Sequence, residues 1–206
     1  MILLAFDTSG PFCAGALFGG SKLLEAGSED MQRGQAERLM PMLEELLSRQ
    51  GHDWSTLEAL AVGTGPGNFT GLRVAVSAAR GLALARGIPA VGVSAFEAWR
   101  EDAPCAVALP APRGDAYFQS FTASGPDAPR QLTQTEASAE AALRGLPLIT
   151  PETALKRDGT PLVARVGRVA LAKLATGAPL PRPAPLYVRA ADAAPSRDAP
   201  PRILGQ

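Results

Sequence analysis

The stretch GTGPGNFTGLRVAVSAARGLALARG, residues 63–87, places a glycine-rich turn directly before a helix of small residues. Many proteins bind phosphate with this arrangement, because the unpaired amides at a helix N-terminus attract anions. A P-loop needs a lysine and then a hydroxyl residue after its last glycine, and Leu72 and Arg73 stand there instead. The dinucleotide-binding fingerprint also fails, since Asn68 or Thr70 occupies the position of its third glycine. The stretch therefore predicts a turn and a helix without either standard phosphate motif.

Two interpretations of this glycine loop stay open. The amides at the helix start form a generic anion site, or the side chain of Asn68 or Thr70 caps them from within the chain. Asp7-Thr8-Ser9 poses the same choice, because ligands sit beyond the carboxyl ends of strands in open α/β sheets, yet these residues are also common in turns. The residue types alone favour a structural turn. The candidate vestigial anion site comprises Asp7, Thr8, Ser9, Gly65, Gly67 and Thr70.

Upstream of this stretch, hydrophobic periodicity predicts a sheet and then a helix. Three apolar or alternating runs, residues 2–7, 13–18 and 22–27, are separated by short turn sequences, which is typical of a β-meander. Residues 35–50 carry leucines at helical spacing, and Gly51 stands where a left-handed residue ends a helix. We therefore expect the chain to begin with three strands followed by one helix.

Downstream, the chain alternates between strands and helices. A buried strand is predicted over residues 57–63, a helix over about 70–86 and another strand over 89–93. Ser94 and Glu97 have the spacing of a capping box, so a further helix is expected to begin there. The first lobe is therefore predicted to have the element order βββαβαβα.

Three regions follow from this pattern: a first lobe over residues 1–102, a smaller α/β lobe over 103–178 and an extended tail over 179–206. The tail carries seven prolines, too many for a packed helix or a central strand. Its apolar group at residues 186–188 is expected to dock on the body. The elements predicted in the second lobe are strands over 105–110 and 116–122, a helix from Thr135 to Arg144, a short apolar run over 146–150 and a helix over 164–176 ended by Gly177.

Composition narrows the class of protein. Twenty basic and twenty acidic residues give no net charge, which disfavours direct, unaided binding of nucleic acid. Cys13 and Cys105 lie outside any C-x-x-C or Cys/His cluster, so a disulfide framework and a zinc site lack support. The first residues do not resemble a signal peptide, and no run reaches about 18 apolar residues. We expect a soluble, cytoplasmic protein that does not enter a membrane.

Four segments, taken together and in order, resemble a known family. They are LLAFDTSGPFCAGALF (3–18), QRGQAERLMPMLEELL (32–47), VGTGPGNFTGLRVAVSAARGLALARGIPAVGVSAFEA (62–98) and PLYVRAADA (185–193). They are similar to the bacterial tRNA threonylcarbamoyladenosine biosynthesis protein TsaB, also called the YeaZ family. The resemblance is strong over residues 1–100, where GPGNFTGLR is the most specific string, and is thinner afterwards.

This resemblance implies both a fold and a role. The fold is the two-lobed α/β fold of actin, sugar kinases and Hsp70 ATPases, with a ribonuclease-H-like sheet in each lobe. The role is that of a non-catalytic partner of the related subunit TsaD, which transfers threonylcarbamoyl to the adenosine beside the anticodon. An ATPase, TsaE, joins that assembly as a third component. Transfer RNA is then reached only through the complex, and the isolated chain is expected to form a homodimer.

Within that resemblance, the residues favour a partner over an enzyme. The catalytic relative holds its metal with a His-x-x-x-His pair on its first long helix, and no histidine lies on that helix here. The single histidine, His52, lies in a loop, and Pro110 stands where the family commonly has an acidic residue, which leaves Asp7 without a second acid. We therefore predict no catalytic residue, no metal site and no cofactor. The alternative is a nucleotide-dependent phosphotransferase or ATPase of the same fold that acts by itself.

Two helices form the candidate partner surface. The first carries an apolar stripe wide enough for a deeply packed helix or for an interface, and both remain open. The second carries small residues that let another helix, or the sheet, approach closely. The resemblance implies that both pack against the same two helices of a second subunit, and the glycine loop is expected to aim the second helix toward it. The predicted interface residues are Leu39, Met42, Leu43, Leu46, Arg73, Val74, Ser77, Ala78, Gly81 and Ala85.

Overall fold

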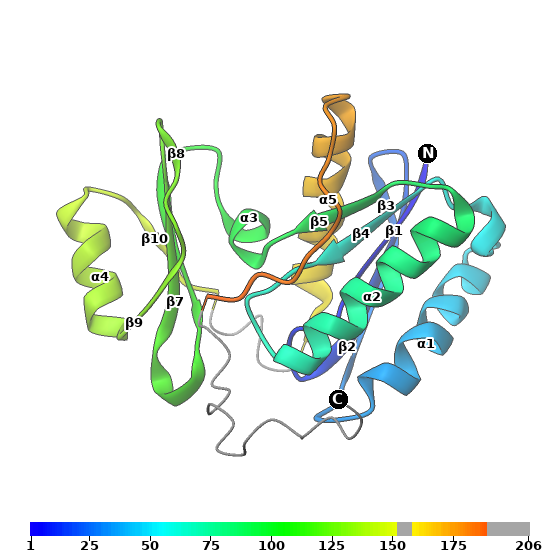
Figure 1. Cartoon of the computed structure of the whole chain (residues 1–206), viewed down its shortest axis with the longest axis horizontal. Helices are drawn as coiled ribbons and strands as arrows, with labels where there is room; N and C mark the ends of the chain where they lie inside the picture. The colour runs from blue at the N-terminus through cyan, green and yellow to red at the C-terminus, as the bar shows by residue number, and fades with distance from the viewer. Residues whose placement is uncertain (152–157, 189–206) are drawn as a thin grey trace, which may run out of the picture.

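The computed structural model describes residues 1–151 and 158–188 of the chain. Two β-sheets carry helices on their faces (Figure 1). The first sheet consists of β1 (Ile2–Asp7), β2 (Phe12–Gly19), β3 (Lys22–Asp30), β4 (Ala59–Gly63) and β5 (Ala90–Val93). The helices α1 (Gln35–Arg49), α2 (Phe69–Arg86) and α5 (Thr160–Ala175) pack on this sheet, and α3 (Ala95–Trp99) packs against α5 and β6. The second sheet consists of β6 (Cys105–Pro110), β7 (Ala116–Thr122), β8 (Gly125–Pro126), β9 (Arg130–Leu132) and β10 (Leu148–Ile149), with α4 (Gln134–Leu143).

The first sheet has the strand order β3-β2-β1-β4-β5. The strands β1, β2 and β3 form an antiparallel meander, and β4 and β5 then add parallel to β1 through helical crossovers. This confirms the predicted order of elements. A three-stranded meander extended by parallel strands, with helices on both faces, is the ribonuclease-H-like arrangement of the actin-like ATPase fold, so the predicted fold class is confirmed as well.

Alternation along β1 decides which helices cover which face of this sheet. Leu4 and Phe6 belong to the buried cluster that contains the apolar side chains of α1 and α2. Leu3 and Ala5 point the other way, into the cluster that contains α5. Figure 1 shows the same division, with α1 and α2 together in front of the sheet and α5 behind it. The two faces of the first sheet are therefore both covered, by different helices.

The second sheet has the order β10-β6-β7-β8, and β9 also pairs with β7. The helix α4 packs on one face through Ala137 and Ala141. From the other face, Val107 and Leu109 of β6 enter the same buried cluster as Phe96 of α3. The two lobes therefore share one apolar core where they meet.

The position of α5 corrects the predicted division into lobes. Residues 164–176 were expected to belong to the second lobe, but α5 lies on the first sheet, against β1 and β2. Its glycines permit this close packing: an added Cβ at Gly167 would sit 2.1 Å from the ring of Phe18. The boundary near residue 102 does separate the two sheets, whereas the range 103–178 does not correspond to one packed unit. Periodicity identifies a helix but not the sheet that the helix covers.

Local signals set the ends of the helices. Beyond the last residue of α1, Gly51 has a φ of +70°, as expected for the residue that ends a helix. The Oγ atom of Ser94 accepts a hydrogen bond from the amide of Glu97 at 3.1 Å, and a carboxylate oxygen of Glu97 accepts one from the amide of Ser94 at 2.8 Å. The predicted capping box at the start of α3 is confirmed.

Residues 178–188 form an extended segment, the C-terminal strap, that follows α5 back across the molecule (Figure 1). The amide of Leu186 donates a hydrogen bond to the carbonyl oxygen of Thr64 at 2.8 Å. Leu186 and Val188 pack against the shared core, which confirms the predicted docking of this apolar group. The remainder of the predicted tail, residues 189–206, lies outside the described residues.

Candidate functional site

The glycine loop lies directly against the turn between β1 and β2. An added Cβ at Gly71 would sit 1.8 Å from the carbonyl oxygen of Thr8, and one at Gly67 would sit 2.4 Å from the carbonyl oxygen of Ser9. Both distances are far shorter than any van der Waals contact. Glycine is required at these positions because only a residue without Cβ lets the two backbones approach so closely.

Hydrogen bonds within the chain hold this junction and cap α2. The Oγ1 atom of Thr8 donates to the carbonyl oxygen of Gly71 at 2.7 Å, and the amide of Asn68 donates to the carbonyl oxygen of Ser9 at 2.7 Å. The Oδ1 atom of Asn68 accepts from the amide of Gly71 at 2.8 Å. Of the two candidate caps, Asn68 is the one used, and Thr70 is exposed. The structural turn, one of the two interpretations of the sequence, accounts for this loop.

Asp7 lies at the end of β1, buried beneath the glycine loop. Its Oδ1 atom accepts a hydrogen bond from the amide of Ser9 at 2.6 Å. An added Cβ at Gly63 would sit 1.5 Å from its Oδ2 atom, so the carboxyl group fills the space beside that glycine. Burial raises the pKa of Asp7 from its usual 3.8 to about 6, and the hydrogen bonds from Ser9 oppose this rise. The structure gathers most of the predicted anion-site residues at this junction.

Replacing Asp7 by asparagine is expected to change how stability depends on pH. Because its pKa is higher in the folded chain, protonated Asp7 favours folding below about pH 4, and this advantage is lost as the pH rises through about 6. The full difference corresponds to about 3 kcal/mol. The free energy of unfolding of Asp7→Asn, minus that of the wild type, should therefore increase between pH 4 and pH 7 in urea titrations. A constant difference across this range would contradict the assignment.

The structure corrects the part of the predicted interface that lies on α1. Leu39, Leu43 and Leu46 are at most 1% exposed and Met42 is 5% exposed, all within the core beneath the helix. Their packing is tight, since an added Cβ at Gly15 of β2 would meet Leu43 at 2.9 Å. These four side chains are therefore core residues and not an exposed partner face. The stripe was identified correctly, but the surface that covers it is the sheet of the same chain.

The α2 part of the predicted interface lies on the outside of the molecule. An added Cβ at Gly81 would meet nothing within 4 Å, and the neighbouring Leu84 is 86% exposed. The small residues Ser77, Gly81 and Ala85 let another helix approach this side of α2 closely, and the exposed Arg73 and Arg80 add positive charge to it. Arg73, Ser77, Gly81 and Ala85 are exposed, and Val74 and Ala78 are half-buried at its edge.

An aromatic cluster at the start of α2 was not predicted from the sequence. The ring of Phe69 lies 5.1 Å from that of Tyr187 in the C-terminal strap. The guanidinium group of Arg73 stacks 3.7 Å from the centre of the Phe69 ring, and its Nε atom donates to the hydroxyl of Tyr187 at 3.1 Å. Both aromatic rings remain more than 40% exposed. The only sequence signal was the expected docking of the apolar group around Tyr187.

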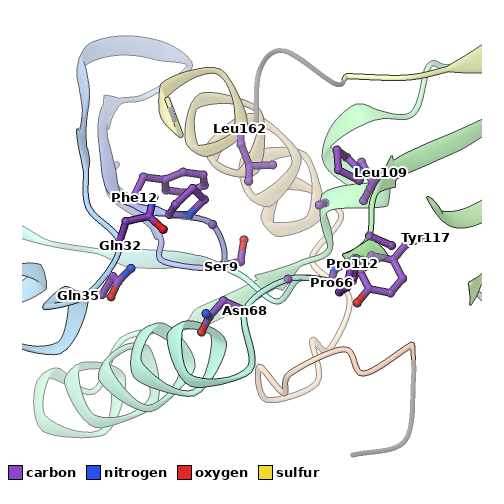
Figure 2. A pocket seen from close by; sticks show the side chains of 16 residues that line it. Ser9, Phe12, Gln32, Gln35, Pro66, Asn68, Leu109, Pro112, Tyr117 and Leu162 are labelled. Carbon is purple, nitrogen blue, oxygen red and sulfur yellow. The ribbon is translucent and has the colours of Figure 1, made fainter. Parts of the chain in front are cut away.

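A pocket of about 420 Å³ lies between the two lobes. In Figure 2, Gln32, Gln35 and Asn68 approach it from the first lobe, and Leu109 and Tyr117 from the second. Among the described residues, its lining has no charged side chain. The pocket therefore offers amide groups and apolar walls, whereas a polyphosphate is normally held by cationic side chains or a metal ion.

Two further properties concern the described residues only. Over residues 1–151 and 158–188, His, Cys, Asp and Glu side chains do not gather in groups of three or more, as a metal site would require. Within the same residues, none of the helices combines the length and the apolar character needed to cross a bilayer.

Comparison with known proteins identifies the relatives of the chain. The family model for TsaD, tRNA N6-adenosine threonylcarbamoyltransferase, matches residues 29–110. The tRNA threonylcarbamoyladenosine biosynthesis protein TsaB of Escherichia coli (strain K12) is 35% identical over 128 residues, which cover 59% of this chain and 55% of that protein. The solved structure of YeaZ from Pseudomonas aeruginosa is 26% identical, with a TM-score of 0.61 over 84% of this chain and 92% of that one. The chain is similar to the TsaB/YeaZ proteins over these residues.

A second solved structure extends this likeness to TsaB/YeaZ over most of the fold. It is a Pseudomonas aeruginosa protein described as similar to peptidase YEAZ, with 25% identity and a TM-score of 0.68 over 91% of this chain and 99% of that one. The chain spans about half the length of the curated TsaB relatives it matches, since the aligned parts cover 43% to 60% of them. The region matched by the TsaD family model contains α1, the glycine loop and α2.

Proposed function

We propose that this chain is a non-catalytic partner subunit in the biosynthesis of tRNA threonylcarbamoyladenosine. It binds a TsaD-type tRNA N6-adenosine threonylcarbamoyltransferase and makes that enzyme competent, and TsaE joins as a third component. The catalytic step takes place in the transferase, in the cytoplasm. The transferase also makes the contacts with the tRNA adenosine that reacts.

The exposed side of α2 is the observation that carries this proposal. The residues around Gly81 leave space for a second helix, and Leu84 is almost fully exposed beside it. An exposed leucine on a helix is stabilised when a partner covers it, at about 25 cal/mol for each Å² of apolar surface removed from water. The α2 face is therefore suited to helix-to-helix contact.

The match to the TsaD family model supports the choice of partner. That match spans residues 29–110, so the transferase family shares with this chain the unit that contains α1 and α2. Two chains that present similar helical surfaces are able to pair about an approximate two-fold axis. The same geometry allows two copies of this chain to pair, so we expect a homodimer when the transferase is absent.

A second candidate function is a phosphotransferase or ATPase that acts by itself. The pocket between the lobes favours it, because it is a cavity of about 420 Å³ at the meeting of two sheets. Two observations weigh against it. The described lining carries no cation for a polyphosphate, and two amides of the glycine loop, those of Asn68 and Gly71, are engaged by Ser9 and Asn68. Calorimetry with ATP and Mg²⁺ distinguishes the two functions.

The proposal is tested by reconstitution with purified components. The transferase should transfer threonylcarbamoyl to tRNA only when this chain is present, and the two should co-elute from a sizing column. An equal rate of transfer without the chain would overturn the proposal. Turnover of ATP by the chain alone would replace it with the second candidate.

A further inference from the structure

A groove of about 620 Å³ runs between α3 and α5, away from the α2 face. The helix α5 covers the face of the first sheet opposite to α1 and α2 (Figure 1). A partner docked on α2 therefore leaves this groove open. The groove is lined by Glu97, Ala98, Arg100, Asp102, Arg165, Arg168, Val169, Ala172, Lys173 and Thr176.

The charges in this groove do not balance. Lys173 is neutralised, since its Nζ atom lies 2.5 Å from a carboxylate oxygen of Glu97. Its ammonium group also donates to the carbonyl oxygen of Gly92 at 3.0 Å, so it is held at the base of α3. Three arginines and Asp102 remain, and none of these arginines forms an ion pair within the part of the chain that the structure describes. The groove therefore carries a local positive charge although the whole chain is neutral.

Aromatic rings hold two of these arginines in place. The guanidinium of Arg165 lies 4.4 Å from the centre of a Trp99 ring, and that of Arg100 lies 5.4 Å from the centre of the Phe121 ring. A stacked guanidinium keeps its N–H edges free, and those edges match the paired oxygens of a phosphate group. Arg168 lies three residues after Arg165, on the same side of α5. The three cations are therefore presented together along one groove.

The rest of the lining leaves room for a ligand. Ala98, Val169 and Ala172 are short side chains between the charged residues. A neighbouring hollow of about 320 Å³ shares Glu97 and Lys173 with the groove and adds Arg182 from the C-terminal strap. Positive charge thus continues beyond the groove, which suits an elongated ligand with regularly spaced anions better than a single small ion.

We propose that the α3–α5 groove binds the phosphate backbone of RNA and helps to hold tRNA while the partner enzyme modifies it. This inference rests on the proposed function, which supplies tRNA as the substrate. The contact is electrostatic and independent of sequence, so it positions the tRNA without selecting it. The groove contributes to the affinity of the complex for tRNA, because no group in the groove takes part in a reaction.

The test uses the complex of the full chain with the transferase. Fluorescence anisotropy with unmodified tRNA compares the wild type with the double variant Arg165→Ala/Arg168→Ala at several salt concentrations. We expect the double variant to bind about 10-fold to 100-fold more weakly at low salt, with a salt dependence whose logarithmic slope is smaller by about 1 to 2. The control, Lys22→Ala/Arg113→Ala, removes the same charge from exposed positions outside the groove and should bind like the wild type.

Other outcomes overturn the inference in distinguishable ways. Equal affinity of the two double variants for tRNA would mean that the groove is not a backbone contact. Binding of inorganic phosphate by calorimetry, lost in Arg165→Ala/Arg168→Ala while tRNA affinity stays unchanged, would assign a small-anion site instead. Loss of co-elution with the transferase in this variant would assign the groove to an acidic protein surface. Failure of the wild-type chain to co-elute with the transferase would contradict the proposed function. In that case, tRNA binding by the isolated chain, compared between the wild type and Arg165→Ala/Arg168→Ala, would still test the groove.

Discussion

Replacing Gly71 by alanine should destabilise the folded chain by about 3 kcal/mol, which is at the upper end of what overpacking usually causes. The added methyl group would sit 1.8 Å from the carbonyl oxygen of Thr8, which is backbone and has no side-chain rotamer to change. Relief of this overlap would separate α2 from the turn after β1. It would also break the hydrogen bond that Thr8 donates to the carbonyl oxygen of Gly71. Urea titration followed by circular dichroism measures the change.

Gly81→Ala is the matched control for this prediction. It makes the same substitution in the same helix, but at a position where the new Cβ meets nothing within 4 Å. Alanine has the higher helix propensity, so this variant should be more stable than the wild type by about 0.5 to 1 kcal/mol. Equal destabilisation by both variants would show that the close approach at Gly71 does not set the requirement for glycine.

Replacing Gly81 by glutamate should abolish stable binding to the transferase. A buried, unpaired carboxylate at a helix contact costs several kcal/mol, and about 3 kcal/mol already weakens binding more than 100-fold. Because Gly81 is exposed with open space around it, the isolated variant should keep its circular dichroism spectrum and its melting temperature. Co-elution and titration calorimetry with the transferase measure the loss.

The control for the interface is Ala142→Glu, at an exposed position of α4 in the second lobe. It introduces the same charge on another helix and should bind the transferase as the wild type does. Undiminished binding of Gly81→Glu would remove α2 from the interface. Leu46→Glu does not serve this purpose, because Leu46 is 1% exposed and its replacement would disrupt the core.

Local sequence signals predicted the elements of this fold well. The glycine loop, the capping box at Ser94 and the glycine at position 51 each encode a backbone conformation in a few adjacent residues, and each is found as expected. The same holds for the meander and the parallel strands, because alternating and continuous apolar runs reflect burial within one strand. The observed ends of these elements differ from the predicted ones by a few residues.

Features that depend on distant residues were missed or misplaced. Periodicity marked the apolar side of α1 and of α5 but carried no information on which sheet would cover it. The contact of Phe69 with Tyr187 joins residues far apart in the chain, and neither has a signal pointing to the other. The zero net charge of the chain gave no indication of the basic groove, because Arg100 and Arg165 come together only in the folded chain.

The shared core between the lobes opposes motion of one lobe relative to the other. A rotation of one sheet relative to the other would pull Phe96 away from Val107 and Leu109, exposing a fully buried aromatic ring to water. The shared core therefore favours one fixed arrangement of the two lobes. A partner bound to α2 and a ligand bound on the opposite face of the first sheet are separated by the thickness of that sheet.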